Sequence, residues 1–121
     1  MPTEEFAYEA KNDLTIKPMQ VRVFIDEIEL LVGVSEGGTH VGYFYMDLEV
    51  RSATGNPGTW YISRIIGYGG FGASSSNYIV ITSKSASIYS STQARGTFSF
   101  STYVGGVYKN SYSGLVVQFN I

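Results

Sequence analysis

An alternation of apolar and polar side chains over residues 39–51 limits the possible folds of this chain more than any other feature. Side chains that alternate in this way point to opposite faces of a β-strand, so the segment is predicted to be a strand with one buried and one wet face. Its 13 residues would span roughly 40 Å, about the full width of a compact domain of this size. Either Gly42 therefore marks a bend or bulge, or the domain is elongated. The apolar positions are Phe44, Met46, Leu48 and Val50, and the others are Tyr43, Tyr45, Asp47, Glu49 and Arg51.

Further strands are predicted from period-two alternation and from short runs of β-branched and aromatic residues. Over residues 24–31, a helical stripe of Phe24, Ile28 and Leu31 competes with the strand pattern, and we favour the strand. Turn chemistry predicts turns at 53–58, at 83–85 and at Gly105-Gly106. The predicted strands are 19–31, 39–51, 59–66, 77–82, 87–91, 97–104, 107–111 and 115–121.

The fold class follows from this succession of short strands. About seven to nine strands without a helix predict an all-β fold, either an antiparallel β-sandwich or a jelly roll. Residues 14–121 are predicted to form one β-sandwich domain, because 121 residues make a single domain by size. Residues 1–13 are acidic and have no clean period, which predicts a lead segment that is mobile or depends on a partner.

Cysteine usage and hydropathy only partly limit where the protein can act, inside or outside a cell or in a membrane. The chain has no cysteine, so it has no disulfide framework and no thiolate metal site. The longest apolar runs are far shorter than the roughly 18 residues of a membrane span. Residues 1–10 lack the basic and apolar regions of a secretory signal. We therefore expect no membrane insertion.

Charge is distributed unevenly along the chain. All ten acidic residues lie between Glu4 and Glu49, where three basic residues accompany them, for a formal charge of −7. The remaining 72 residues carry five basic side chains and no carboxylate, a formal +5. The boundary falls inside the strand predicted at 39–51, so it indicates polarity within one fold rather than two domains.

Catalytic chemistry is poorly supported by the residue types present. His40 is the only histidine and has no cysteine to activate. The pair Asp47 and Glu49 shares one strand face, and we interpret it as a solvated face, because no dense run of oxygen ligands accompanies it. We therefore predict a protein that is not an enzyme and that holds no metal and no cofactor.

Two further ligand classes are disfavoured. Residues 67–72 superficially resemble a phosphate-binding loop, but no Lys-Ser/Thr pair follows and no helix opens after them. Binding of nucleic acid would need a more basic surface than five basic residues scattered over 72 positions can provide. We predict no nucleic-acid partner.

Aromatic residues point instead to recognition. The chain has ten tyrosines, and tyrosine is common in recognition surfaces and subunit interfaces. Residues 67–76 are predicted to be a flexible Gly/Ser-rich loop carrying Tyr68 and Phe71, and aromatic faces beside Ser and Asn donors suit sugars. An equally open alternative is that these aromatics fold back over the end of the sandwich. Outward-facing Tyr43 and Tyr45 would expose apolar faces on a monomer, which predicts self-association.

A resemblance to known families rests on residues 58–66, Gly-Thr-Trp-Tyr-Ile-Ser-Arg-Ile-Ile, followed by a Gly/Ser loop, short strands and a terminal strand. Over residues 59–121 this pattern resembles the C-terminal tip domains of trimeric phage-type tail fibres and related bacterial fibre adhesins. Residues 111–115 are also similar to the last strand of the trimeric jelly rolls of C1q and tumour necrosis factor. Both resemblances imply a homotrimeric β-rich head, although no stalk repeat stands before the domain here.

Together these observations predict a non-enzymatic fibre-tip adhesin or receptor-binding domain, extracellular or on a virion surface, that attaches to a cell-surface glycan or another surface receptor. The alternatives are a structural virion or assembly protein, such as a decoration or baseplate component, and a small carbohydrate-binding module. Trp60 is assigned to the core because Ile62 shares its strand face. The predicted ligand-binding residues are Tyr68, Phe71, Asn77, Tyr108 and Tyr112.

Overall fold

Two antiparallel sheets contain all the strands of the part of the chain that the structure describes. The computed structural model describes residues 13–52 and 59–121, so the turn predicted at 53–58 and most of the lead segment predicted at 1–13 lie outside the described residues. The prediction of an all-β antiparallel sandwich is confirmed. The strands are β1 (Leu14–Ile16), β2 (Gln20–Phe24), β3 (Glu27–Glu36), β4 (Thr39–Ser52), β5 (Trp60–Gly72), β6 (Tyr78–Ser90), β7 (Gln93–Val104) and β8 (Val107–Asn120).

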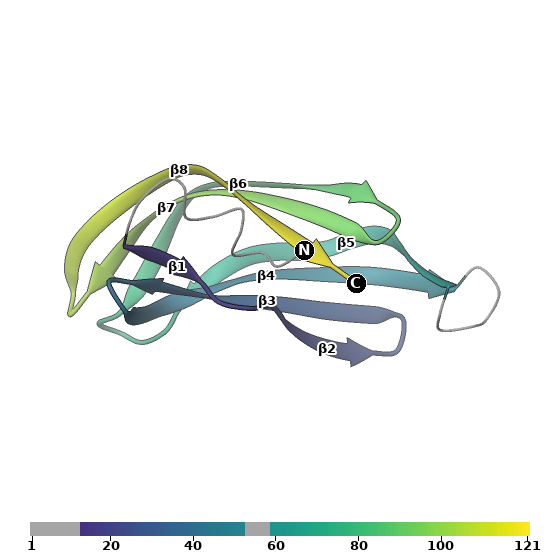
Figure 1. Ribbon diagram of the computed structural model, residues 1–121, viewed down its shortest axis with the longest axis horizontal. Coiled ribbons are helices and arrows are strands. Elements are labelled where there is room, and N and C mark those ends of the chain that lie inside the picture. The colour runs from purple at the N-terminus through teal and green to yellow at the C-terminus, as the bar shows by residue number, and fades with distance from the viewer. Residues whose placement is uncertain (1–12, 53–58) are drawn as a thin grey trace.

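The five-stranded sheet runs in the order β1-β3-β4-β5, and β2 pairs with β3 along the same edge as β1. The second sheet has the order β6-β7-β8. Figure 1 shows the sheets as two layers that both run along the long axis of an elongated molecule. Both possibilities raised for residues 39–51, an elongated domain and a bulge near Gly42, are present, because β4 also contains a bulge. Gly42 pairs with Val34 and His40 with Ser35, so Val41 is left between the two pairs.

The core lies between the sheets, and β4 confirms the predicted alternation. The inner residues of β4 are buried, whereas its outer residues are partly or fully exposed. The ring of Phe44 stacks on Phe98 of β7 with centroids 4.3 Å apart, and it meets Phe100 edge-on at 5.0 Å. Trp60 packs against this core from β5, beside buried Ile62, as predicted.

The prediction of a flexible loop at residues 67–76 is wrong over its first six positions. Residues 67–72 continue β5 and pair with β4 from Asp47 to Gly42. Gly70 has no room for a side chain because β6 comes close: a Cβ built on it would lie 2.8 Å from the Cδ1 atom of Ile81. Backbone pairing with β4 holds the segment extended despite its loop-like composition.

Two other predicted breaks are also absent. The turn expected at 83–85 is part of β6, because these residues pair with Thr97, Phe98 and Ser99 of β7. The last two predicted strands form a single strand, β8, in which Gly114 takes a φ of 67° at an irregularity in the register. The strand predicted over 19–31 is interrupted by a turn in which Asp26 has a φ of 60°, and the helical alternative for residues 24–31 is wrong.

A buried carboxylate links the two sheets. Glu36, at the end of β3, is 4% exposed. Its Oε1 accepts hydrogen bonds from the hydroxyls of Thr102 at 2.6 Å and Tyr112 at 2.7 Å, and its Oε2 accepts one from Nδ2 of Asn110 at 3.1 Å. Three donors from β7 and β8 thus replace the water that the carboxylate loses on burial. Burial and the neighbouring Glu36 raise the pKa of Tyr112, which keeps its hydroxyl protonated as a donor.

Removing one of these donors should weaken the fold. We expect Tyr112→Phe to lower the free energy of unfolding by about 1–2 kcal/mol, because the buried carboxylate of Glu36 would lose one of its hydrogen-bond donors. Urea denaturation would measure the change. Tyr108→Phe is the matched control, since Tyr108 is 53% exposed and loss of its hydroxyl should change stability by less than about 0.5 kcal/mol. Equal losses in the two variants would contradict the role assigned to Tyr112.

Candidate functional site

Tyr68 and Phe71, the two aromatics predicted to share a loop, lie on opposite faces of β5. Tyr68 pairs with Met46 and packs against the core, whereas Phe71 pairs with Tyr43 and is 46% exposed. Lys84 covers Tyr68: its Nζ lies 4.9 Å from the ring centroid and donates to the Tyr68 carbonyl oxygen at 2.9 Å. Of the two predicted residues, only Phe71 therefore lies on the outer face, which we define as the side of the five-stranded sheet that points away from the three-stranded sheet.

Phe71 belongs to an aromatic cluster on this outer face. Its ring centroid lies 5.2 Å from that of Tyr43 and 6.2 Å from that of Tyr45. His40 packs edge-on against Tyr43 at 4.7 Å. The aromatic rings occupy the outer positions of adjacent strands, where cross-strand neighbours are close enough to touch.

Two glycines of β5 leave part of this face uncovered. Gly69 pairs with Tyr45, and Gly67 pairs with Asp47, so neither residue has a β5 side chain directly opposite it. Asp47 and Tyr45 consequently contribute to a hollow of about 420 Å³. We call it the outer-face hollow. Its lining residues are Arg22, Glu29, Leu31, Tyr45, Asp47 and Phe71.

The Asp47 carboxylate has an unusual environment in this hollow. Its Oδ1 atom is buried and has no hydrogen-bond partner among the described residues. Burial raises the pKa of Asp47, and the nearby carboxylates of Glu29 and Glu27 raise it further. The site therefore contains an acceptor that the described part of the chain does not satisfy.

Glu49, two residues further along β4, shows the opposite behaviour. It accepts a hydrogen bond from the Ser63 hydroxyl at 2.7 Å and lies 3.4 Å from both Arg51 and Arg64. The Ser63 hydrogen bond, followed by the two arginines, lowers the pKa of Glu49. Neighbouring carboxylates of one strand face thus differ: Glu49 is held by partners and Asp47 is not.

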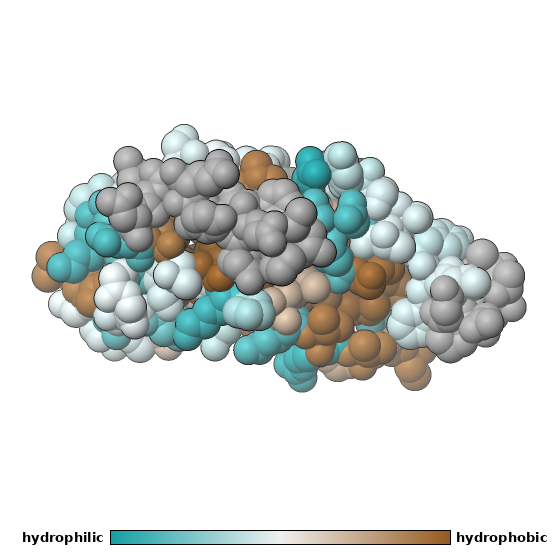
Figure 2. All heavy atoms as spheres, in the orientation of Figure 1, coloured by the Kyte–Doolittle hydropathy of each residue, from teal (hydrophilic) through white to brown (hydrophobic). Residues whose placement is uncertain are grey.

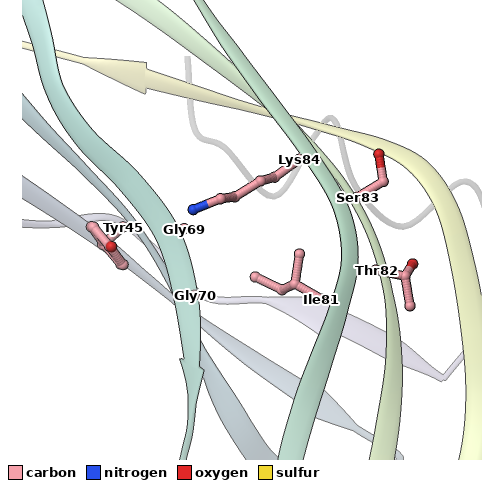
Figure 3. A pocket seen from close by; sticks show the side chains of 7 residues that line it. All are labelled: Tyr45, Gly69, Gly70, Ile81, Thr82, Ser83 and Lys84. Atoms are coloured by element: carbon pink, nitrogen blue, oxygen red, sulfur yellow. The ribbon is translucent and has the colours of Figure 1, made fainter.

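A second hollow of about 380 Å³ lies at the seam between β5 and β6, and Figure 3 shows it from close by. Ile81 and Lys84 point from β6 toward the backbone of β5 at Gly69 and Gly70. Tyr45 lines this seam as well as the outer-face hollow. Thr82 and Ser83 complete the lining. Tyr45 therefore borders both hollows: the outer-face hollow, which contains carboxylates, and the hollow at the β5–β6 seam, which contains Lys84.

The other predicted ligand residues lie elsewhere. Asn77 accepts a hydrogen bond from the Gly105 backbone N–H at 2.9 Å and so braces the β7–β8 turn. Tyr108 is exposed on the three-stranded sheet, where its ring meets Tyr103 edge-on at 5.9 Å. Tyr112 is 3% exposed and hydrogen-bonded to Glu36, so its prediction as a surface ligand residue does not agree with the structure. The five predicted residues do not form one site.

Among the residues that line the outer-face hollow, the sequence predicts a ligand-binding role only for Phe71; the lining residues without this prediction are Arg22, Glu29, Leu31, Tyr45 and Asp47. The alternation of β4 placed Tyr45 and Asp47 on one face, but Asp47 was interpreted as solvated and Tyr45 as a contact for self-association. A signal for their use was present in Gly67 and Gly69, once these are recognised as strand positions. Only the register between β4 and β5 shows that these glycines lie opposite Tyr45 and Asp47.

Comparison with known proteins identifies no relative, since no family model, no curated protein and no solved structure matches the chain. Within residues 13–52 and 59–121, no group of three or more His, Cys, Asp or Glu side chains is placed to hold a metal ion. The same residues include no helix with the length and apolarity needed to cross a membrane.

Neutralising Asp47 should stabilise the protein at neutral pH. Its raised pKa means that the folded state binds this proton more readily than the unfolded state, so the ionised form opposes folding above the folded pKa. We expect Asp47→Asn to raise the urea midpoint at pH 7, and the gain to shrink as acidification protonates Asp47 in the native protein. Glu49→Gln is the matched control and should lower the midpoint at pH 7, because the pKa of Glu49 is lowered. A lower midpoint for Asp47→Asn would contradict this account.

Proposed function

We propose that this protein is a non-enzymatic attachment domain that binds glycans through the outer-face hollow, at an extracellular or particle surface. The observation that supports this proposal best is the combination in one hollow of aromatic rings, Tyr45 and Phe71, with the unpartnered carboxylate oxygen of Asp47. Ligand sites commonly combine an apolar or aromatic lining with a few polar groups that fix orientation.

A sugar ring matches these groups chemically. Its C–H face is apolar and can pack against the aromatic rings of Tyr45 and Phe71, which provide large apolar surfaces. Its hydroxyls can donate to Asp47 and Glu29 and accept from Arg22, which lines the same hollow. The oxygen that such a donor would meet is Oδ2 of Asp47, which lies on the side of Gly67, because Oδ1 is buried.

The position of His40 supports binding rather than acid–base chemistry. The only histidine of the chain packs against Tyr43 and is not among the residues that line the hollow. Both of its ring nitrogens are buried without a hydrogen-bond partner among the described residues. It is thus placed to support the aromatic cluster and not to exchange protons with a ligand.

A second candidate function, a structural or assembly role, is favoured by exposed apolar residues around β2. Val21 and Val23 pair with buried Leu30 and Ile28, so they lie on the inner side of the sheet, yet they are 51% and 58% exposed. Ile25, in the following turn, is 93% exposed. Figure 2 shows apolar residues gathered where β2 lies in Figure 1. Exposed apolar patches on an edge strand are typical of subunit contacts, which would suit the homotrimeric fibre tip that we expect.

The glycan proposal predicts that the aromatic walls are needed for binding. On a glycan array we expect Tyr45→Ala and Phe71→Ala to weaken the strongest signals about tenfold or more, because each removes a stacking surface. Gly67→Val should weaken binding as well, since its side chain would enter the space beside Asp47. Apart from the adjoining residues 66 and 68, a Cβ at Gly67 meets only the Asp47 Oδ2 atom, at 3.9 Å, so the variant should still fold.

Tyr108→Ala is the control for these variants, because Tyr108 is an exposed tyrosine on the other sheet. It should bind like the unaltered protein. Glycan binding that is lost in Tyr108→Ala and kept in Tyr45→Ala would move the site to the three-stranded sheet. A protein that binds no glycan but forms a defined oligomer would favour the assembly role.

The exposed residues of β2 predict the oligomeric state. Light scattering should give a molar mass near three times the 13.3 kDa of one chain. Val23→Lys should reduce the mass to that of a monomer, because it places a charge in the apolar contact. Val80→Lys, at a 43% exposed valine of β6, is the matched control and should leave the oligomer intact. A monomeric native protein would contradict the homotrimer.

A further inference from the structure

Asp47 faces another carboxylate and has no ion pair with any basic side chain of residues 13–52 and 59–121. Across the β3–β4 pairing it lies opposite Glu29. Glu29 is paired with Arg22 at 3.4 Å, and Glu49 is paired with two arginines. The carboxylates beside Asp47 along the strand and across it thus have basic partners, and Asp47 does not.

The space next to Asp47 is open on the side of β5. Gly67 is its cross-strand partner there, and apart from the adjoining residues 66 and 68 a Cβ on Gly67 would meet within 4 Å only the Asp47 carboxylate. The buried Oδ1 atom has no hydrogen-bond partner among the described residues. A group that enters the outer-face hollow meets the other oxygen, Oδ2, which faces Gly67 and belongs to a carboxylate without an ion pair among the described residues.

The remaining walls of the hollow suit a cation. Aromatic faces such as those of Tyr45 and Phe71 attract ammonium groups through their ring quadrupole. Arg22 also lines the hollow, but its charge is paired with Glu29 and its guanidinium lies 5.4 Å from the ring of Phe24. Two carboxylates and one arginine leave the hollow with one uncompensated negative charge, that of Asp47.

We infer that the glycan bound in the outer-face hollow carries a free amino group, as in a chain of de-N-acetylated hexosamine, and that Asp47 is the specificity-determining residue. The ammonium group pairs with the Asp47 carboxylate while the sugar ring lies against Tyr45 and Phe71. A charge-assisted hydrogen bond of this kind is stronger than one from a hydroxyl. The inference rests on the proposed glycan-binding function and names its ligand class.

Calorimetric titration with three oligosaccharides of equal length tests the inference: β-1,4-linked glucosamine, N-acetylglucosamine and glucose. The pH is set below the pKa of the sugar amine. We expect the glucosamine oligomer to bind about tenfold or more tightly than the other two. Asp47→Asn should reduce its affinity to that of the neutral sugars, whereas Tyr45→Ala should weaken all three. Glu49→Gln removes a charge from the same strand outside the hollow and should keep the preference.

The outcomes separate this inference from the proposed function. Equal affinity of the unaltered protein for the three sugars would overturn the inference and leave glycan binding in place, and this comparison requires no variant to fold. A preference that persists in Asp47→Asn would also overturn it. Lysine oligomers of matched charge that bind as tightly as the glucosamine oligomer would show that charge alone is recognised, and would overturn the amino-sugar class. Absence of binding to every sugar would overturn the proposed function itself.

Discussion

The pleat of β4 is the constraint on which both the core and the candidate site depend. Phe44 points inward and stacks on Phe98 across the sandwich, while its neighbour Tyr45 points outward into the hollow. Because successive side chains of a strand face opposite sides, the packing that holds Phe44 also fixes the direction of Tyr45. A slip of one residue would place Tyr45 and Asp47 in the core, at a large energetic penalty for the buried carboxylate.

The glycines of β5 act on both faces of the sheet. On the inner side, Gly70 allows Ile81 of β6 to approach closely enough for the sheets to meet at this edge. On the outer side, Gly67 and Gly69 place no side chain directly opposite Asp47 and Tyr45. The same Gly-rich segment thus brings the two sheets together and opens the binding surface.

The uneven charge of the chain has a structural meaning in this fold. The acidic residues precede position 50, so the carboxylates of the described strands belong to the five-stranded sheet, and β6, β7 and β8 have none. Glu36 is turned inward, where Thr102, Asn110 and Tyr112 hold the two sheets together through it. Glu29 and Asp47 are turned outward and line the hollow. The acidic N-terminal part of the sequence therefore supplies both a contact between the sheets and carboxylates of the candidate site.

Local sequence patterns were enough to predict several properties of the protein: its all-β class, the alternation of β4, the turn at Gly105-Gly106 and the packing of Trp60 against the core. Side-chain alternation is a property of the strand alone, so it can be read without knowing what the strand pairs with. Contacts between residues far apart in the sequence depend on how the strands pair and pack. Gly67 to Gly72 have the composition of a loop, yet hydrogen bonds to β4 make them a strand, separate Tyr68 from Phe71 and place Phe71 beside Tyr43. Register between strands depends on packing across the whole sheet, and local preference cannot specify it.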